Sequence, residues 1–294
     1  MQISDAMLAH LKTGVTTLCR CWEIHRTDGP RQGFTDHDKL INFNNLSFEA
    51  DTGLSASTLQ QATGLSVDNA EAMGGLSAAA ISEVDIAAGR YDGAKVTCWL
   101  VNWAAPEQRA VLFRGTLGQL ERSGGAFKAE LRGLTDQLNE PMGRSYQAPC
   151  GAVLGDMACG VNLSGAGYRT EQPLAEVISA SELHFAAFGG FEAGWFTRGR
   201  LEVLGGAAVG LRAPVKLDEL IDGGRRITLW EPLRAELQPG DQIALFAGCD
   251  KRFATCRLKF NNALNFRGFP DILSDDWMTA HPATSQQVDG GSRR

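Results

Sequence analysis

The chain has 294 residues, of which 44% are hydrophobic and 21% are charged, a balance typical of folded globular proteins. Its 34 acidic residues outnumber the 28 basic ones and give a net charge of −6, which argues against a basic nucleic-acid-binding surface. No apolar run approaches the ~20 residues that cross a bilayer, and the N-terminus lacks a basic, apolar signal segment. We therefore expect a protein made in the cytoplasm, without membrane insertion.

The first elements along the chain are a short helix and a strand. Ser4 is a suitable N-cap for a helix that carries Leu8 and Leu11 and ends at Gly14. Residues 15–26 are rich in β-branched and aromatic side chains, which predicts a strand. The 34 glycines of the chain indicate many tight turns and favour a strand-rich fold.

The next segment predicts more strands, with turns between them. A hairpin is expected around Asn44-Asn45, because both residues tolerate the left-handed backbone of a tight turn. A weak repeat of Gly-Leu-Ser with a spacing of about eleven residues runs through 52–77. It fits either a solenoid or, as we favour, successive strands of one sheet. Further on, the pattern predicts helices over 78–88 and 134–138 and strands over 95–103, 110–116 and 126–131.

A glycine-containing stretch with little periodicity, residues 141–169, separates this part from a second β-rich part. The expected strands there cover 183–191, 195–203, 210–216, 226–229 and 242–246. The sequence thus predicts a mainly β protein with two β-rich, barrel-like domains, a few short helices and long glycine-containing loops. We expect the domains to cover 1–146 and 147–273, followed by a polar tail over 274–294.

Four of the seven cysteines form two pairs in the second domain, Cys150 with Cys159 and Cys249 with Cys256. Four thiolates can bind zinc or an iron–sulfur cluster. The spacings match neither the usual zinc pairs nor the ferredoxin runs, so buried thiols and disulfides remain alternatives. Basic residues beside the second pair favour the metal interpretation, because cations offset a thiolate-rich site.

Other candidates for chemistry are weaker. Asp36-His37-Asp38 could bind a metal or act as acid and base, but a polar turn is the favoured interpretation. The remaining cysteines, Cys19, Cys21 and Cys98, are expected to be structural. Trp195, Trp230 and Trp277 could form a sugar-binding face, although core packing is favoured. The chain contains no GxSxG, HExxH, Walker A or GxGxxG motif, so the sequence does not predict an enzyme.

Several long segments resemble a known family. GFTDHDKLINF, GLSVDNAEAMGGL, ISEVDIAAGRYDGAKVTCWLVNW and LFRGTLGQL resemble the N-terminal domain of tail-tip or baseplate hub proteins of long-tailed phages and gene transfer agents. YQAPCGAVLGDMACGVNL and AGCDKRFATCRLKFNNALNFRGFP resemble the C-terminal domain of the same family. This resemblance, which covers about residues 1–273, extends more distantly to the lambda tail tip protein, whose C-terminal domain holds an iron–sulfur cluster on four cysteines.

The resemblance implies a structural role in a virion-like tail. It implies a homotrimeric ring between the distal tail ring protein and a large central tip or fibre protein, on the path of DNA, with a tail peptidase among the possible neighbours. It also implies that Cys150, Cys159, Cys249 and Cys256 hold a [4Fe–4S] cluster, with zinc as the fallback metal. The net charge of −6 suggests that any lumen is not basic and lets DNA slide. A tail-associated cell-wall hydrolase or a glycan-binding tip module is the alternative.

Overall fold

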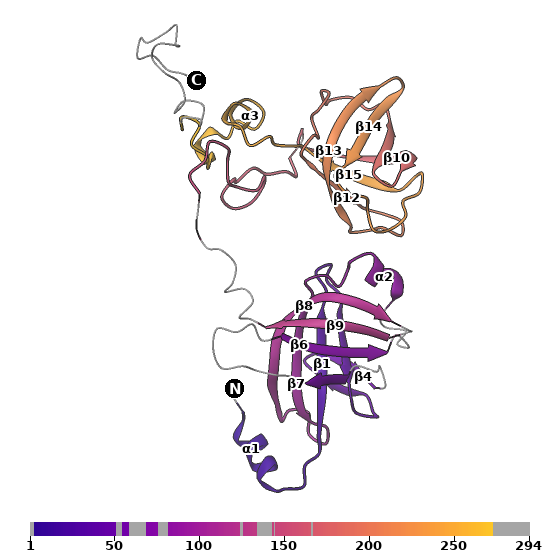
Figure 1. The fold of residues 1–294 in the computed structure, drawn as a ribbon, viewed down its shortest axis with the longest axis vertical. Coiled ribbons are helices and arrows are strands. Elements are labelled where there is room, and N and C mark those ends of the chain that lie inside the picture. The colour runs from indigo at the N-terminus through magenta and orange to yellow at the C-terminus, as the bar shows by residue number, and fades with distance from the viewer. Residues whose placement is uncertain are drawn as a thin grey trace. The chain divides into compact units, whose positions relative to one another are not determined.

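The computed structural model describes residues 3–50, 55–58, 69–75, 82–123, 126–133, 143, 145–165 and 167–272. The chain divides into two compact units, Met1–Pro141 and Met142–Arg294, each of which is described here by itself (Figure 1). Both are built mainly from strands, and the helices are short, which confirms the predicted fold class. The predicted helix over 134–138 and the tail over 274–294 lie outside the described residues. No helix within the described ranges is long and apolar enough to span a membrane.

The first unit opens with helix α1 (Asp5–Lys12), as the sequence predicts. The Ser4 hydroxyl accepts a hydrogen bond from the Met7 amide at 3.3 Å and so caps the first turn. Met7 is fully buried, which attaches the helix to the unit by one apolar side chain. After the helix, Gly14 adopts the left-handed backbone expected of a helix end.

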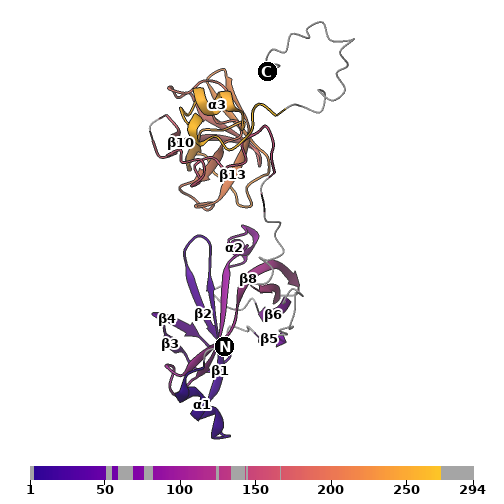
Figure 2. The same cartoon turned by 90° about the vertical axis from the view of Figure 1, so that its left-hand side faces the viewer.

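The body of the first unit is a nine-stranded sheet in the order β3-β4-β2-β1-β7-β8-β9-β6-β5 (Figure 2). The strands are β1 (Leu18–His25), β2 (Arg31–Thr35), β3 (Ile41–Phe43), β4 (Leu46–Glu49), β5 (Ser55–Thr58), β6 (Asn69–Gly75), β7 (Lys95–Asn102), β8 (Arg109–Ser123) and β9 (Ala126–Gly133). Helix α2 (Glu83–Ala87) falls within the predicted helical segment 78–88. The strands predicted at 15–26, 95–103, 110–116 and 126–131 are confirmed as β1, β7, β8 and β9.

Two local predictions for this sheet can be compared with the structure. Asn44 and Asn45 both have positive φ, 52° and 55°, and join β3 to β4 in the expected tight hairpin. The repeat over 52–77 overlaps β5 and β6, which pair antiparallel in the sheet, as successive strands would. The rest of that repeat lies outside the described residues.

The central strand β1 carries apolar side chains on both faces. Cys19 and Cys21 belong to one buried cluster, and Trp22 and Ile24 belong to another. Because side chains alternate between the faces of a strand, β1 is covered on both sides. This placement confirms that Cys19 and Cys21 are core residues of the sheet.

The second unit contains a closed barrel in the order β10-β11-β14-β13-β12-β15. Its strands are β10 (Arg169–Ser179), β11 (Glu182–Ala186), β12 (Arg200–Val203), β13 (Arg212–Ile221), β14 (Gly224–Leu229) and β15 (Gln242–Phe246). The barrel interior is filled by aliphatic and aromatic side chains, among them Leu183, Phe185, Leu201, Val215 and Ile227. The barrel is followed by helix α3 (Phe253–Leu258) and the 3-10 helix η2 (Ala263–Asn265).

The structure differs from the sequence prediction in three parts of this barrel. The strand predicted over 183–191 is β11, which ends at Ala186. Strand β10 was not predicted, because Leu174 is its only buried side chain and the strand shows no apolar alternation. The predicted strand 195–203 is strand only at Arg200–Val203. Phe196 lies in the turn that precedes this strand and is fully buried in the core. The apolar residue thus reflects core packing and not a strand.

Candidate metal centre

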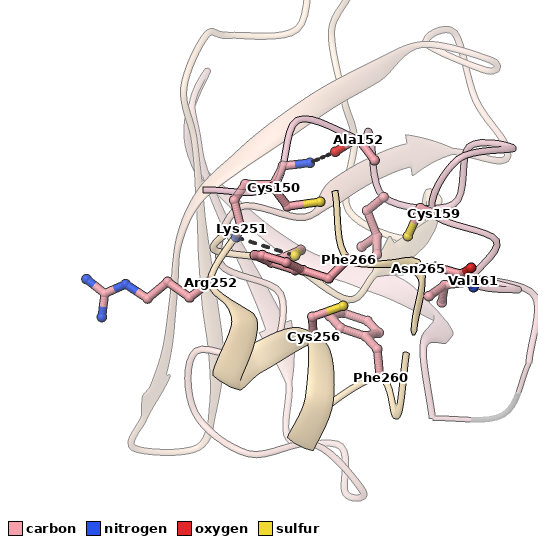
Figure 3. A pocket seen from close by; sticks show the side chains of 12 residues that line it. Cys150, Ala152, Cys159, Val161, Lys251, Arg252, Cys256, Phe260, Asn265 and Phe266 are labelled. Atoms are coloured by element: carbon pink, nitrogen blue, oxygen red, sulfur yellow. Dashed lines mark hydrogen bonds between the residues drawn. The ribbon is translucent and has the colours of Figure 1, made fainter. Parts of the chain in front are cut away.

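The four cysteines of the second unit line one pocket (Figure 3). Cys150 and Cys159 lie in the segment before β10, Cys249 follows β15, and Cys256 lies on α3. The first and last strands of the barrel pair antiparallel, with Arg169 opposite Phe246. Closure of the barrel therefore brings the segment before β10 beside the segment after β15, although 89 residues separate Cys159 from Cys249.

Main-chain hydrogen bonds join the two segments at the pocket. The Cys150 amide donates to the Lys251 carbonyl at 2.9 Å, and the Gly151 amide donates to the Arg267 carbonyl at 3.3 Å. The Lys251 ammonium donates to the Ala152 carbonyl. The pocket is thus held by contacts of the protein itself, and a bound group would add to an existing arrangement.

Backbone amides also point at two of the sulfur atoms. The Lys251 amide lies 3.4 Å from Cys249 Sγ, and the Arg267 amide lies 3.4 Å from Cys150 Sγ. Such N–H groups stabilise negative charge on a thiolate and tune the metal that it binds. The sulfur atoms of Cys150 and Cys249 therefore lie in an environment that stabilises a thiolate.

Asp156 orders the loop between the first two cysteines. Its carboxylate accepts hydrogen bonds from the Val153 amide at 2.9 Å and from the Cys159 amide at 2.6 Å. These backbone donors lower the pKa of Asp156. No spacing rule marks a loop-capping aspartate, so the sequence contains no signal for this role of Asp156.

Two glycines allow the backbone to approach closely around the pocket. A Cβ on Gly248, the residue before Cys249, would lie 1.7 Å from the Thr197 carbonyl oxygen. A Cβ on Gly268 would lie 2.5 Å from the Ala148 carbonyl oxygen. Both distances are far below any van der Waals contact, so only glycine fits at these positions without a backbone shift.

Lys259 attaches the cysteine-bearing segment to the barrel. Its ammonium donates to the Trp195 carbonyl at 2.6 Å and to the Gly248 carbonyl at 2.9 Å, and lies 4.3 Å from the centre of the Trp195 ring. Burial lowers the pKa of Lys259, opposed by the nearby Cys249 and acidic groups. The carbonyls and the ring compensate the buried charge.

The chemistry of the pocket fits a group bound by thiolates. Burial raises the pKa of Cys249, and burial together with the other three cysteines raises the pKa of Cys256. Binding of a cationic group replaces these protons and relieves the repulsion between thiolates. In the described residues, no three side chains of Cys, His, Asp or Glu lie close enough to hold a single metal ion. Thiolates are ligands of both zinc and iron–sulfur clusters.

The other candidates from the sequence lie elsewhere and have structural surroundings. Asp36 accepts a hydrogen bond from the Arg20 amide at 2.7 Å, and His37 Nδ1 accepts one from the Lys39 amide at 2.9 Å, as in a polar turn. Cys98 is fully buried in β7, where burial raises its pKa to about 12. All seven cysteines are free thiols, so the structure contains no disulfide.

The tryptophans proposed as a sugar-binding face differ in their surroundings. Trp195 packs against the barrel core, and its indole N–H donates to the Gly167 carbonyl at 3.0 Å. Trp230 is exposed, with the Lys216 ammonium 5.5 Å from its ring centre. Trp277 lies outside the described residues. The favoured interpretation, core packing, therefore holds for Trp195.

Family models match both the first and the second part of the chain. Residues 4–162 match a family described as the N-terminal attachment domain of a baseplate hub protein. Residues 194–276 match a family described as a conserved hypothetical phage protein. A chain in the solved virion of a native gene transfer agent particle is 53% identical, with a TM-score of 0.90 over 98% of this chain and 99% of that one. No curated protein matches the chain.

Proposed function

Because the chain belongs to the baseplate hub protein family, we propose that it forms a ring in a phage-like tail, braced by an iron–sulfur cluster and crossed by DNA. The chain is a component of a gene transfer agent virion, at its baseplate. The finer proposal is a homotrimeric ring between the distal tail ring protein and the central tip protein. Its role there is structural and not enzymatic.

The observation that carries the proposal is the match to the gene transfer agent virion chain over nearly the full length of both chains. At 53% identity and a TM-score of 0.90, the likeness includes both units and the segments that bear the cysteines. A shared fold alone would not carry a function, since one fold serves many functions. Here the sequence likeness accompanies the fold throughout.

The cluster is proposed as a brace of the second unit. When bound, a [4Fe–4S] cluster supplies iron–sulfur bonds to four cysteines, which would be Cys150, Cys159, Cys249 and Cys256. These bonds would join the segment before β10 to α3 and the segment after β15, in addition to the hydrogen bonds and the Tyr168–Phe260 ring contact that join them already. Because metal binding of this kind counts as folding free energy, the cluster would stabilise the unit directly.

Exposed apolar side chains around the cysteines support contacts with other virion proteins. Met157 is 100% exposed, Leu264 is 98% exposed and Leu258 is 79% exposed. The three side chains lie on the segments that bear the cysteines, and exposed large apolar side chains favour burial against a partner. The distal tail ring protein, the central tip protein and further copies of the chain are the proposed partners.

The acidic balance of the chain supports passage of DNA. A net charge of −6 provides no general attraction for phosphates, so DNA would not be held while it passes. A density map of the assembled ring that shows a strongly basic lumen would contradict this part of the proposal.

The test begins with anaerobic purification of the full chain and measurement of iron, sulfide and zinc per chain, together with native mass spectrometry. We expect about four irons and four sulfides per chain and a trimeric mass. Cys256→Ala is expected to lose the cluster and to impair assembly, whereas Cys98→Ala, a buried cysteine of the first unit, should keep the cluster. If the wild type contains iron and sulfide but the Cys256→Ala variant assembles normally, the proposed role of the cluster as a brace would be contradicted.

A further inference from the structure

Asn262 contacts one cysteine from each of the two pairs. Its side-chain Nδ2 donates to the Cys159 carbonyl at 2.6 Å. Its main-chain N–H donates to the Cys256 carbonyl at 3.0 Å, and its own carbonyl oxygen lies 3.3 Å from Cys256 Sγ. A single residue therefore joins the loop that bears Cys159 to the helix that bears Cys256.

The orientation of the Asn262 amide follows from its partners. The Cys159 carbonyl can only accept a hydrogen bond, so the end of the amide that faces it is the NH₂ group. On the other side, Asn262 Oδ1 accepts a hydrogen bond from Asn265 Nδ2 at 2.8 Å. Both ends of the amide are satisfied in this orientation alone, and Asn265 thereby keeps the NH₂ group directed at Cys159.

The same NH₂ group lies near a ligand sulfur. Asn262 Nδ2 is 3.7 Å from Cys159 Sγ, within the range of an N–H···S hydrogen bond. Hydrogen bonds to the sulfurs of a metal site orient the ligands and shift the reduction potential of a cluster. Of the four sulfurs, those of Cys150 and Cys249 receive backbone amides, and Cys159 receives this side-chain amide.

The turn that presents Asn262 requires an unusual backbone. The preceding residue, Asn261, has φ of 48°, in the left-handed region that asparagine tolerates better than most residues. This turn ends α3 and begins η2, and it directs the Asn262 side chain back toward the loop of Cys159.

We propose that Asn262 is a positioning residue of the four-cysteine site. It holds Cys159 and Cys256 in place for a shared metal group and donates an amide N–H toward the Cys159 sulfur. The proposal rests on the proposed function, since it takes the four cysteines as ligands of an iron–sulfur cluster.

The test compares the full-length wild type with Asn262→Ala and Asn262→Asp after anaerobic reconstitution with iron and sulfide. Leu220→Ala is the control, because Leu220 lies on β13 of the same unit, is 54% exposed and does not line the cysteine pocket. We expect iron loss to a chelator to be roughly tenfold faster or more in Asn262→Ala, the usual effect of removing such an outer partner. Asn262→Asp should lose iron faster still and show a lower reduction potential, because a carboxylate replaces the donor. Leu220→Ala should lose iron at the rate of the wild type and show the same reduction potential.

The outcomes separate this proposal from the one on which it rests. A wild type that takes up neither iron nor sulfide would overturn the cluster itself. If the wild type contains the cluster and the Asn262 variants match it in iron content, rate of iron loss and reduction potential, the role of Asn262 is overturned. Asn265→Ala provides a second test in case the Asn262 variants do not fold. It leaves Asn262 in place but removes the donor to Asn262 Oδ1. It should accelerate iron loss, to a smaller extent than the Asn262 variants do. If Asn265→Ala matches wild type while the Asn262 variants do not fold, the positioning role is likewise rejected.

Discussion

The buried ion pair of the barrel offers a sharp test of how the second unit is held together. Asp218 on β13 and Arg225 on β14 have side-chain exposures of 0% and 1%, and Asp218 Oδ1 lies 2.9 Å from Arg225 Nε. The other Asp218 oxygen accepts the Phe196 amide at 2.9 Å. Arg225 donates to the carbonyls of Phe191 and Glu192. The pair thus anchors the turn before β12 to the barrel.

We expect Asp218→Asn to destabilise the second unit by about 3 kcal/mol. The variant keeps the size of the side chain and an acceptor for the Phe196 amide, but it leaves the Arg225 charge buried without its carboxylate. Breaking a buried pair in this way costs ~3–5 kcal/mol. The lower end applies here because two carbonyls and the Phe188 and Phe196 rings, each 5.1 Å from the guanidinium carbon, still surround the charge.

Calorimetry of the full chain measures this loss. At about 2–4 °C per kcal/mol for a unit of roughly 150 residues, the melting transition of the second unit should fall by about 6–12 °C. The control is Glu219→Gln, which removes the neighbouring pair with Arg226, where both side chains are more than a third exposed. Such a surface pair contributes about 0–1 kcal/mol. A shift below about 2 °C in Asp218→Asn, or equal shifts in both variants, would refute the reasoning.

Three further predictions concern other parts of the chain. Ser4→Ala should cost about 1 kcal/mol, because the Met7 amide loses its cap, and faster hydrogen exchange confined to α1 would show it. Lys259→Met should destabilise the second unit by about 1–3 kcal/mol, because the Trp195 and Gly248 carbonyls lose their hydrogen-bond donor. Protease cleavage within 249–272 should then be faster. An unchanged cleavage rate would contradict the role of Lys259 in attaching this segment to the barrel. Arg26 lowers the pKa of Asp28, so the stability from this carboxylate is present above the unfolded pKa of ~3.9 and is lost as pH falls through the lower folded value. Asp28→Asn should flatten that acid-side loss in a series of melts from about pH 6 to pH 2, and a parallel curve would contradict it.

Patterns along the chain predicted those strands that bury alternate side chains. Strand β7 places Val96, Cys98 and Val101 in the buried clusters of the sheet, and its limits were predicted within one residue. Strand β10 buries Leu174 alone and is held by hydrogen bonds to β11 and β15. Because main-chain pairing leaves no trace in side-chain type, the sequence contained no signal for β10.

The candidate site shows the same division. The cysteines are candidate metal ligands by residue type and by the family resemblance, since thiolates are the chemistry that such groups require. Asp156, Lys259 and Asn262 could not, because each acts by a contact to a carbonyl or amide distant in the chain or set by a loop. No spacing rule describes such contacts.

Four features of this protein are predictable from the sequence alone: the mainly β fold, the capped first helix, the asparagine hairpin and the two pairs of cysteines. These follow from local rules of backbone preference, side-chain alternation and ligand chemistry. That the four thiols line one pocket is visible only in the folded chain. Their meeting depends on the antiparallel pairing of β10 with β15, which closes the barrel and places its two flanking segments side by side. That pairing is a property of the whole barrel, and no local segment of the sequence encodes it.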